Sequence, residues 1–249
     1  MKKVLSLNDG WIFCKEGVKE TVNIPHTWNG LDGQGACGED GYFRGACTYT
    51  RILPRYDGQV YLEFLGANSI CTVKVNGRLA GKHEGGYSTF RVDITKLLTS
   101  PKNFLEVTVD NSESKTTYPG FADFTFYGGL YRGVNLIYDV PETHFSLTDF
   151  GSKGVYVTPK MNGDVYVKAV VTGYHTGVKV RYDILDAEGK IVATAGDKEK
   201  LHVDNPTLWN GMENPYLYTL KASVLDNGAV MDEVKLRFGF RDIKFDSDK

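Results

Sequence analysis

The sequence predicts an all-β protein with a sandwich architecture. Apolar and polar residues alternate with a period of two in several short runs, which places successive side chains on opposite faces of a sheet. Dipeptides of the Asn-Gly and Asp-Gly kind separate these runs, as expected for hairpin turns. Only residues 93–98 have the pattern of a helical turn, because Asp93 can cap it and Pro101 prevents its continuation.

In the first half of the chain, the alternation predicts strands joined by tight turns. Asn76-Gly77 can adopt the two positive φ angles of a type I′ turn. The strand that ends at Val75 is therefore expected to fold back through Arg78 and Leu79. Asp57-Gly58 is expected to form a similar turn. The clearest strand runs in this half are residues 60–64, 71–75 and 105–109.

The composition changes near Pro141, beyond which the same alternation recurs in cleaner form. Turn dipeptides at Asn162-Gly163, Glu188-Gly189 and Asn227-Gly228 have the spacing of a sandwich of about 100 residues. Residues 1–142 and 143–242 are therefore predicted to form two domains, and residues 243–249 to begin a linker. The strand runs of the second domain are residues 155–157, 165–171, 178–184, 216–224 and 234–238.

Composition and charge exclude several classes of function. Lysine and arginine number 29 and aspartate and glutamate 31, so the formal net charge is −2 and no long run of like charge occurs. Nucleic acid and membrane are therefore not expected partners. The four cysteines and five histidines lack zinc-ligand spacing, which favours free, largely buried thiols. The sequence shows neither a secretory signal nor an apolar run of about 18 residues, which favours a cytoplasmic location. Secretion stays open for a chain from which a leader has been removed.

A set of separate motifs occurs in a recognisable order along essentially the whole chain. They are Leu7–Phe13, Pro25-His-Thr-Trp28, Tyr42–Gly45, Val73–Gly81, Asp123–Arg132, Leu208-Trp209, Asn214–Tyr218 and Arg237-Phe-Gly-Phe-Arg241. In this order they resemble glycoside hydrolase family 2, the β-galactosidase class. The resemblance implies a jelly-roll (galactose-binding-like) sugar-binding domain, then an immunoglobulin-like β-sandwich, then a (β/α)₈ barrel beyond Lys249 that carries the chemistry.

The resemblance implies that the chain is the N-terminal, non-catalytic part of a retaining β-glycosidase, with a β-galactosidase that hydrolyses terminal β-galactosides as the first expectation. Retaining glycosidases need two carboxyl groups about 5 Å apart. In this family both are glutamates of the barrel, and the acid/base follows an asparagine. No Asn-Glu pair occurs in the 249 residues. We therefore expect no catalytic residue in this chain and no hydrolysis by the chain alone.

Other functions stay open on the sequence alone. Within the family, β-glucuronidases carry an aspartate at the position of Asp123, and β-mannosidases share the architecture. Outside it, a stand-alone carbohydrate-binding module or lectin-like protein would use the same jelly roll. The Arg237–Arg241 segment argues against that alternative, because in the family it leads into the barrel. A structural pair of adhesion-type sandwiches is a third alternative. Family members are commonly dimers or tetramers, which implies a homo-oligomer.

The resemblance points to three substrate-binding residues. Asp123 lies where family members send an aspartate to a sugar hydroxyl, in some beside a sodium ion; a carboxylate suits both tasks. The alternative is a loop aspartate that caps local amides.

Tyr42 lies roughly where some galactosidases present an asparagine. Its residue type departs from that pattern, and the alternative is that Tyr42 packs in the core or at an interface. Arg132 is a candidate substrate contact. The alternative is a structural role, in which its guanidinium binds a carboxylate or backbone carbonyls and so fixes the loop. The resemblance also implies a sodium or magnesium ion in the full-length enzyme, with Asp123 as a contact of sodium. It implies no cofactor for this chain.

His26 and Trp28 resemble a reactive histidine beside an aromatic platform. The more ordinary interpretation is a hydrogen-bonded histidine and a buried indole, because the segment follows Pro25 and is used for packing in the family.

Overall fold

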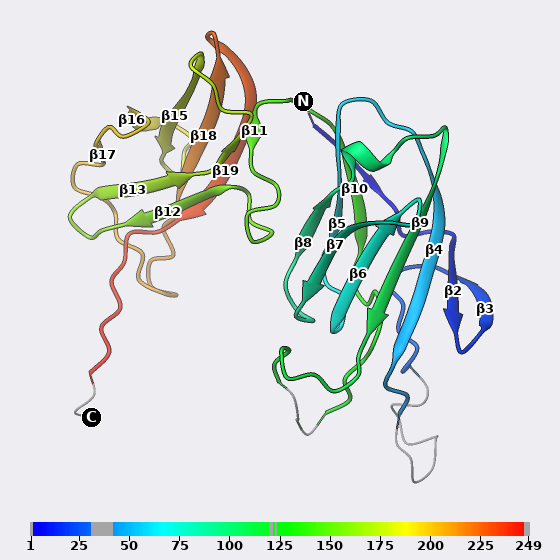
Figure 1. The fold of residues 1–249 in the computed structure, drawn as a ribbon. Coiled ribbons are helices and arrows are strands. Elements are labelled where there is room, and N and C mark those ends of the chain that lie inside the picture. The colour runs from blue at the N-terminus through cyan, green and yellow to red at the C-terminus, as the bar shows by residue number, and fades with distance from the viewer. Residues whose placement is uncertain (1, 31–41, 120–121, 123, 247–249) are drawn as a thin grey trace. The chain divides into compact units, whose positions relative to one another are not determined.

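The structure is a computed structural model that describes residues 2–30, 42–119, 122 and 124–246. Within these residues the regular structure is β, apart from one 3₁₀ turn, η3 (Thr95–Leu97). This turn lies in the segment expected to form a helical turn, and Asp93 Oδ1 accepts the backbone N–H of Thr95 at 2.9 Å. The chain divides into two compact units, the first ending at Val140 and the second starting at Pro141 (Figure 1). The all-β prediction is confirmed.

The first unit is a sandwich of two antiparallel sheets. One sheet has the strand order β1-β10-β5-β8, and the other has the order β3-β2-β4-β9-β6-β7. The strands are β1 (Lys3–Ser6), β2 (Trp11–Lys15), β3 (Val18–Val22), β4 (Ala46–Pro54), β5 (Gln59–Phe64), β6 (Ile70–Val75), β7 (Arg78–Glu84), β8 (Phe90–Asp93), β9 (Lys102–Asp110) and β10 (Val134–Val140).

The core of the first unit lies between these two sheets, where the alternation places it. The alternating apolar positions of β5, β6 and β9 are all buried, and Leu62, Val73 and Val107 are fully inaccessible to solvent. Burying such a side chain contributes ~1.5–3 kcal/mol. Trp11 is also fully buried, and its indole Nε1 donates a hydrogen bond to the carbonyl oxygen of Leu7 at 2.6 Å. The sandwich is thus held mainly by apolar burial.

The predicted type I′ turn joins β6 to β7. Asn76 has φ 51° and Gly77 has φ 76°, the left-handed region that this turn requires. The side chain of Asn76 also fixes the turn to its neighbours, since its amide donates to Asn103 Oδ1 at 2.9 Å and its carbonyl accepts Phe104 N–H at 2.9 Å. The prediction of this hairpin is confirmed.

The second unit is a smaller β-sandwich. A four-stranded sheet of order β16-β15-β18-β19 packs against a three-stranded sheet of order β12-β13-β17, and β11 pairs with β14. The strands are β11 (His144–Phe145), β12 (Val155–Pro159), β13 (Asp164–Ala169), β14 (Val171–Thr172), β15 (Val178–Leu185), β16 (Ile191–Gly196), β17 (Leu201–His202), β18 (Tyr218–Asp226) and β19 (Ala229–Phe238). Asn227 and Gly228 both have positive φ at the β18–β19 turn, as expected.

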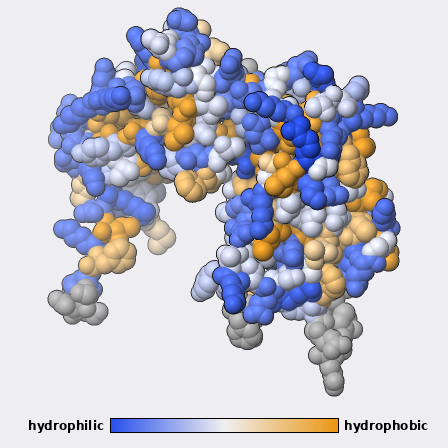
Figure 2. Space-filling view, in the orientation of Figure 1, coloured by the Kyte–Doolittle hydropathy of each residue, from blue (hydrophilic) through white to orange (hydrophobic). Residues whose placement is uncertain are grey.

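The surface and the cysteines follow from this architecture. Hydrophilic side chains make up much of the surface in view in Figure 2, and hydrophobic ones are scattered between them. No helix among the described residues is long and apolar enough to cross a membrane. Cys47 and Cys71 are buried free thiols, and Cys14 is partly exposed. Burial raises the pKa of Cys47 to about 12, so this thiol is a poor nucleophile at neutral pH. Cys37 lies outside the described residues.

Candidate functional site

Two of the three predicted substrate-binding residues flank one loop of the first unit, residues 124–130, which we call the site loop. The hydroxyl oxygen of Tyr42 accepts the backbone N–H of Phe126 at 3.0 Å. Just after the loop, Arg132 Nη1 donates to the carbonyl oxygens of Tyr87 at 3.1 Å and Leu65 at 3.4 Å. Asp123 lies outside the described residues. Tyr42 and Arg132 therefore both help to hold the backbone in place, and their substrate roles stay predictions.

Two buried asparagines hold the backbone of the site loop by hydrogen bonds. Asn29 and Asn111 have exposed fractions of 0% and 1%. The side-chain amide of Asn111 donates to Asn29 Oδ1 at 3.1 Å and to the carbonyl of Phe126 at 2.8 Å. Asn29 Oδ1 also accepts the backbone N–H of Gly128 at 2.7 Å. The backbone of the loop is thus bonded at two points to side chains that water does not reach.

The same two asparagines bind the segment that carries Tyr42. Asn29 Nδ2 donates to the carbonyl of Phe43 at 2.8 Å, and Asn111 Oδ1 accepts the N–H of Gly45 at 2.9 Å. Arg44 Nε donates to the backbone carbonyl of Asn111 at 2.8 Å. Residues 26–30, 42–45 and 124–130, which are far apart in sequence, are therefore joined through two side-chain amides. We call this arrangement the amide junction.

Glycines allow the site loop to approach the amide junction closely. A Cβ atom on Gly128 would lie 2.1 Å from Trp28 Cζ2 and 2.8 Å from Asn111 Cγ, so no other residue fits. Gly129 has φ 124° and exchanges backbone hydrogen bonds with Asn68. Asn68 Nδ2 also donates to the carbonyl of Tyr127 at 2.9 Å. Gly128 is therefore required by the nearby side chains of Trp28 and Asn111, and Gly129 by its backbone conformation.

His26 and Trp28 pack beneath the same segment. His26 Nδ1 shares a hydrogen bond with the Tyr49 hydroxyl at 2.8 Å, and burial lowers the pKa of His26, so its ring is neutral at pH 7. The ring of Phe13 lies 4.7 Å from that of His26 and stacks on that of Trp28 at 6.0 Å. Trp28 Nε1 is buried with no hydrogen-bond partner among the described residues. The packing interpretation fits His26, and it fits Trp28 apart from this N–H group.

The exposed side chains of the site loop are suited to binding a sugar rather than to catalysis. Phe124 and Tyr127 of the site loop are 53% and 42% exposed, and aromatic faces of this kind stack on the C–H face of a sugar. No group of three or more His, Cys, Asp or Glu side chains suited to a metal ion occurs among the described residues.

Three asparagines that build the site were not found by sequence reasoning. Asn29, Asn68 and Asn111 have no sequence signal beyond their positions after strands or beside glycine.

Comparisons with known proteins place both units in one family. Residues 51–141 match the model of the family 2 glycosyl hydrolase sugar-binding domain, and residues 153–241 match a second model of glycosyl hydrolases family 2. The β-glucuronidase of Bacteroides fragilis is 31% identical over 98% of this chain, which covers 38% of that protein. The β-galactosidase of Thermoanaerobacterium thermosulfurigenes is 30% identical over 100% of this chain, which again covers 38% of that protein.

A solved structure supports the same assignment. The crystal structure of an FMN-binding β-glucuronidase from Facaelibacterium prausnitzii L2-6 has a TM-score of 0.85 and is 40% identical, over 97% of this chain and 40% of that one. The chain therefore spans about two fifths of each of these relatives. Both domain models, the order of the two sandwiches and these likenesses agree. The chain belongs to family 2 of the glycosyl hydrolases, and it comprises the sugar-binding domain and the immunoglobulin-like domain of that family.

Proposed function

We propose that the natural protein containing this chain, called the parent protein below, is a β-glycosidase that hydrolyses β-glucuronides. The observation that supports this proposal most is the likeness to the FMN-binding β-glucuronidase of Facaelibacterium prausnitzii L2-6, which is 40% identical with a TM-score of 0.85. The β-glucuronidase of Bacteroides fragilis adds 31% identity over 98% of the chain. These relatives favour a glucuronide over the galactoside that the sequence motifs placed first.

β-Galactosides are the second candidate substrates. The β-galactosidase of Thermoanaerobacterium thermosulfurigenes is 30% identical across the whole chain, so this candidate keeps direct support. Sugar-binding domains of the two enzyme kinds share the amino-acid patterns found here, and specificity within such enzymes depends on groups that contact the sugar rather than on the fold.

In this proposal the chain supplies one wall of the sugar site, and a catalytic domain of the parent protein supplies the two carboxyl groups. The site loop, with Asp123 before it, would meet the sugar. Tyr42 keeps its hydroxyl proton available as a donor, because it accepts a hydrogen bond from Phe126 N–H. Arg132 donates to the two carbonyl oxygens through Nη1, and a guanidinium carries five N–H donors. A sodium or magnesium ion near Asp123 belongs to the same proposal.

The test is a substrate comparison with the purified parent protein. Chromogenic β-glucuronide, β-galactoside and β-mannoside, which carry the same leaving group, are compared by kcat/KM. We expect the glucuronide to give the highest value. A higher value for the galactoside would replace the proposal with the second candidate. Turnover of none of the three would reject both.

A further inference from the structure

Arg44 is an exposed arginine whose guanidinium is held at two points beside the site loop. Its Nε donates to the backbone carbonyl of Asn111 at 2.8 Å, and its guanidinium carbon lies 4.9 Å from the centre of the Phe126 ring. An exposed arginine without such contacts samples many rotamers. The residues that build the amide junction and the site loop therefore also fix the position of this positive charge.

The end of the Arg44 guanidinium has no partner. Nε is bonded to Asn111, but the N–H donors on Nη1 and Nη2 have no acceptor, and Arg44 forms no ion pair, in the described part of the chain. The planar fork of a guanidinium matches the two oxygens of a carboxylate. Because Nε is occupied, Arg44 can bind a carboxylate end-on through Nη1 and Nη2.

Arg44 lines a narrow cleft between the site loop and residues 114–119. The cleft has a volume of about 10 Å³, which is room for a group the size of one water molecule. It therefore admits a carboxylate oxygen but not a sugar ring. Arg44 is the only charged side chain among the described residues that line the cleft, and hydroxyl groups of Ser69, Tyr87, Ser114, Thr117 and Tyr118 belong to the same lining.

The acidic side chains of the neighbouring segments are not paired with Arg44. Glu84 is paired with Lys82 at 2.6 Å, and the carboxylate of Asp110 accepts a backbone N–H at 2.8 Å. Residues 113–115 contain one acidic and one basic side chain and are neutral in sum. The positive charge at the cleft is therefore available to an anion from outside the chain.

The site loop places an exposed aromatic ring close to Arg44. Phe124 is 53% exposed, and its ring centre lies 5.1 Å from that of Phe126, the ring on which the Arg44 guanidinium rests. A sugar ring stacks on such an aromatic face through its C–H groups. A hexuronide carries its carboxylate outside the sugar ring, so a hexuronide on Phe124 can reach Arg44 with this group.

We propose that Arg44 is a specificity-determining residue of the sugar site and that its Nη1 and Nη2 bind the carboxylate of a hexuronide. This inference rests on the proposed function, in which the site loop meets the sugar. A glucoside differs from a glucuronide only in having a hydroxymethyl group in place of the carboxylate, so it lacks the partner for Arg44. The contact therefore favours the glucuronide over the glucoside.

The test compares the unaltered parent protein with Arg44→Ala, Arg44→Lys and a control, Arg55→Ala. Arg55 is exposed and lies just beyond the opposite end of β4. Chromogenic β-glucuronide and β-glucoside with the same neutral leaving group are compared by kcat/KM. We expect Arg44→Ala to lower the value for the glucuronide about 10- to 100-fold and to leave that for the glucoside within about twofold. Arg44→Lys should recover part of the loss, because it keeps the charge without the planar fork. Arg55→Ala should change neither value.

The ratio of the two kcat/KM values separates recognition from a structural role. If Arg44 only supported the loop through Asn111 and Phe126, its loss would lower both values together, because both sugars would use the same loop. An Arg44→Ala enzyme with the same ratio as the unaltered enzyme would overturn the proposal.

Binding of free sugars distinguishes failure of this inference from failure of the proposed function. Calorimetry of the parent protein should show tighter binding of glucuronic acid than of glucose, and Arg44→Ala should remove the difference. Such Arg44-dependent binding without hydrolysis of any glucuronide would reject the proposed function alone. Hydrolysis of the glucuronide with a ratio that does not depend on Arg44 would reject this inference alone. Equal binding of the two sugars together with no hydrolysis of the glucuronide would reject both.

Discussion

Asn29 and Asn111 show why the amide junction needs asparagine and not another polar residue. Asn111 both donates, to Asn29 Oδ1 and the Phe126 carbonyl, and accepts, from Gly45 N–H. Aspartate could accept the Gly45 bond but could not donate the other two, and it would bring a negative charge next to two oxygen atoms. Only a side-chain amide supplies both kinds of group in this space. The position of the site loop therefore depends on the chemistry of two residues.

Replacing Asn111 tests this dependence. Asn111→Ala should lower the free energy of unfolding by about 3 kcal/mol, because it removes three hydrogen bonds that join three segments and leaves the Phe126 carbonyl and the Gly45 N–H without this partner. Asn111→Asp should be at least as harmful. The control is Asn23→Ala, an exposed asparagine whose Oδ1 accepts Gly10 N–H, which should cost less than about 1 kcal/mol. Urea unfolding of the first unit measures all three, and equal costs for Asn111→Ala and Asn23→Ala would contradict the account.

Asp123 is best tested in the parent protein. If its carboxylate accepts a sugar hydroxyl, Asp123→Ala should lower kcat/KM for the preferred glycoside about 10- to 100-fold. Asp57→Ala, a change to an exposed aspartate in a turn, should leave the kinetics unchanged. Circular dichroism checks that both variants fold. Kinetics of Asp123→Ala equal to those of the unaltered enzyme would remove this residue from the site.

The sequence could not have predicted the amide junction. Asn29 and Asn111 are 82 positions apart, and an isolated asparagine after a strand is more often a turn residue. The pairing of β4 with β9 brings Ala46 opposite Asp110 and so places residues 42–45 beside Asn111. Asn29 joins them only through its hydrogen bonds to Phe43 and Asn111. In contrast, Asp123, Tyr42 and Arg132 came from family resemblance, and their substrate roles stay predictions.

At the scale of elements, period-two alternation predicted several of the strands that have one buried face. The runs at residues 60–64, 71–75 and 105–109 all lie in strands whose inward side chains are buried. The same signal missed β16 (Ile191–Gly196). That strand is at the edge of its sheet, and Ala195 is its only buried residue, so it has no apolar alternation. Sequence periodicity thus detects burial, and a strand that buries little is not detected.

The site loop makes a prediction about glycine. Gly128→Ala should destabilise the first unit by about 3 kcal/mol and shift tryptophan fluorescence to longer wavelength, because the new methyl group would displace Trp28. Gly10→Ala also replaces a glycine in this unit, at φ 70°, but a Cβ there meets nothing within 4 Å. It should cost only about 1 kcal/mol of backbone strain. The two variants are compared by thermal unfolding with fluorescence detection, and equal effects would contradict the packing argument.

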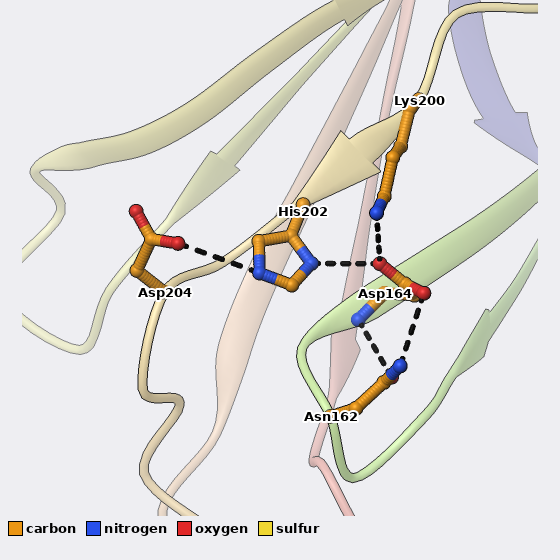
Figure 3. A network of polar contacts seen from close by, with 5 residues as sticks. All are labelled: Asn162, Asp164, Lys200, His202 and Asp204. Atoms are coloured by element: carbon orange, nitrogen blue, oxygen red, sulfur yellow. Dashed lines mark hydrogen bonds and ion pairs between the residues drawn. The ribbon is translucent and has the colours of Figure 1, made fainter.

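The network around Asp164 makes a prediction about acid stability. Hydrogen bonds from His202, and then from Lys200, hold the pKa of Asp164 below its ordinary value of 3.8, and Figure 3 shows both partners at the carboxylate. A carboxylate with a depressed pKa stabilises the folded state above its unfolded pKa, and that stabilisation is lost as the pH falls through the folded value. Asp164→Asn should therefore flatten the loss of stability below about pH 3.8.

The matched comparison for this prediction is Lys200→Ala. It keeps the larger contribution, from His202, so most of the acid sensitivity should remain. Urea midpoints recorded between neutral and strongly acidic pH measure the effect in each variant. An acid limb of Asp164→Asn that follows the unaltered chain would show that this carboxylate does not contribute.

At the scale of the whole molecule, the chain is two sandwiches with separate cores. The first unit contributes the site loop, and the second has a core of its own. The relatives it resembles are glycosidases of which it spans about two fifths. Its sequence lacks the Asn-Glu pair that the resemblance associates with catalysis. Our central proposal is that this chain shapes a sugar site and that another part of the parent protein supplies the two carboxyl groups that break the bond.

The most direct test compares the 249-residue chain with the parent protein on one chromogenic β-glucuronide, at equal molar concentrations. The account predicts turnover by the parent protein and none above the buffer blank by the chain alone, since glycoside hydrolysis needs two carboxyl groups across one bond. Turnover by the chain alone, retained after further purification, would contradict it.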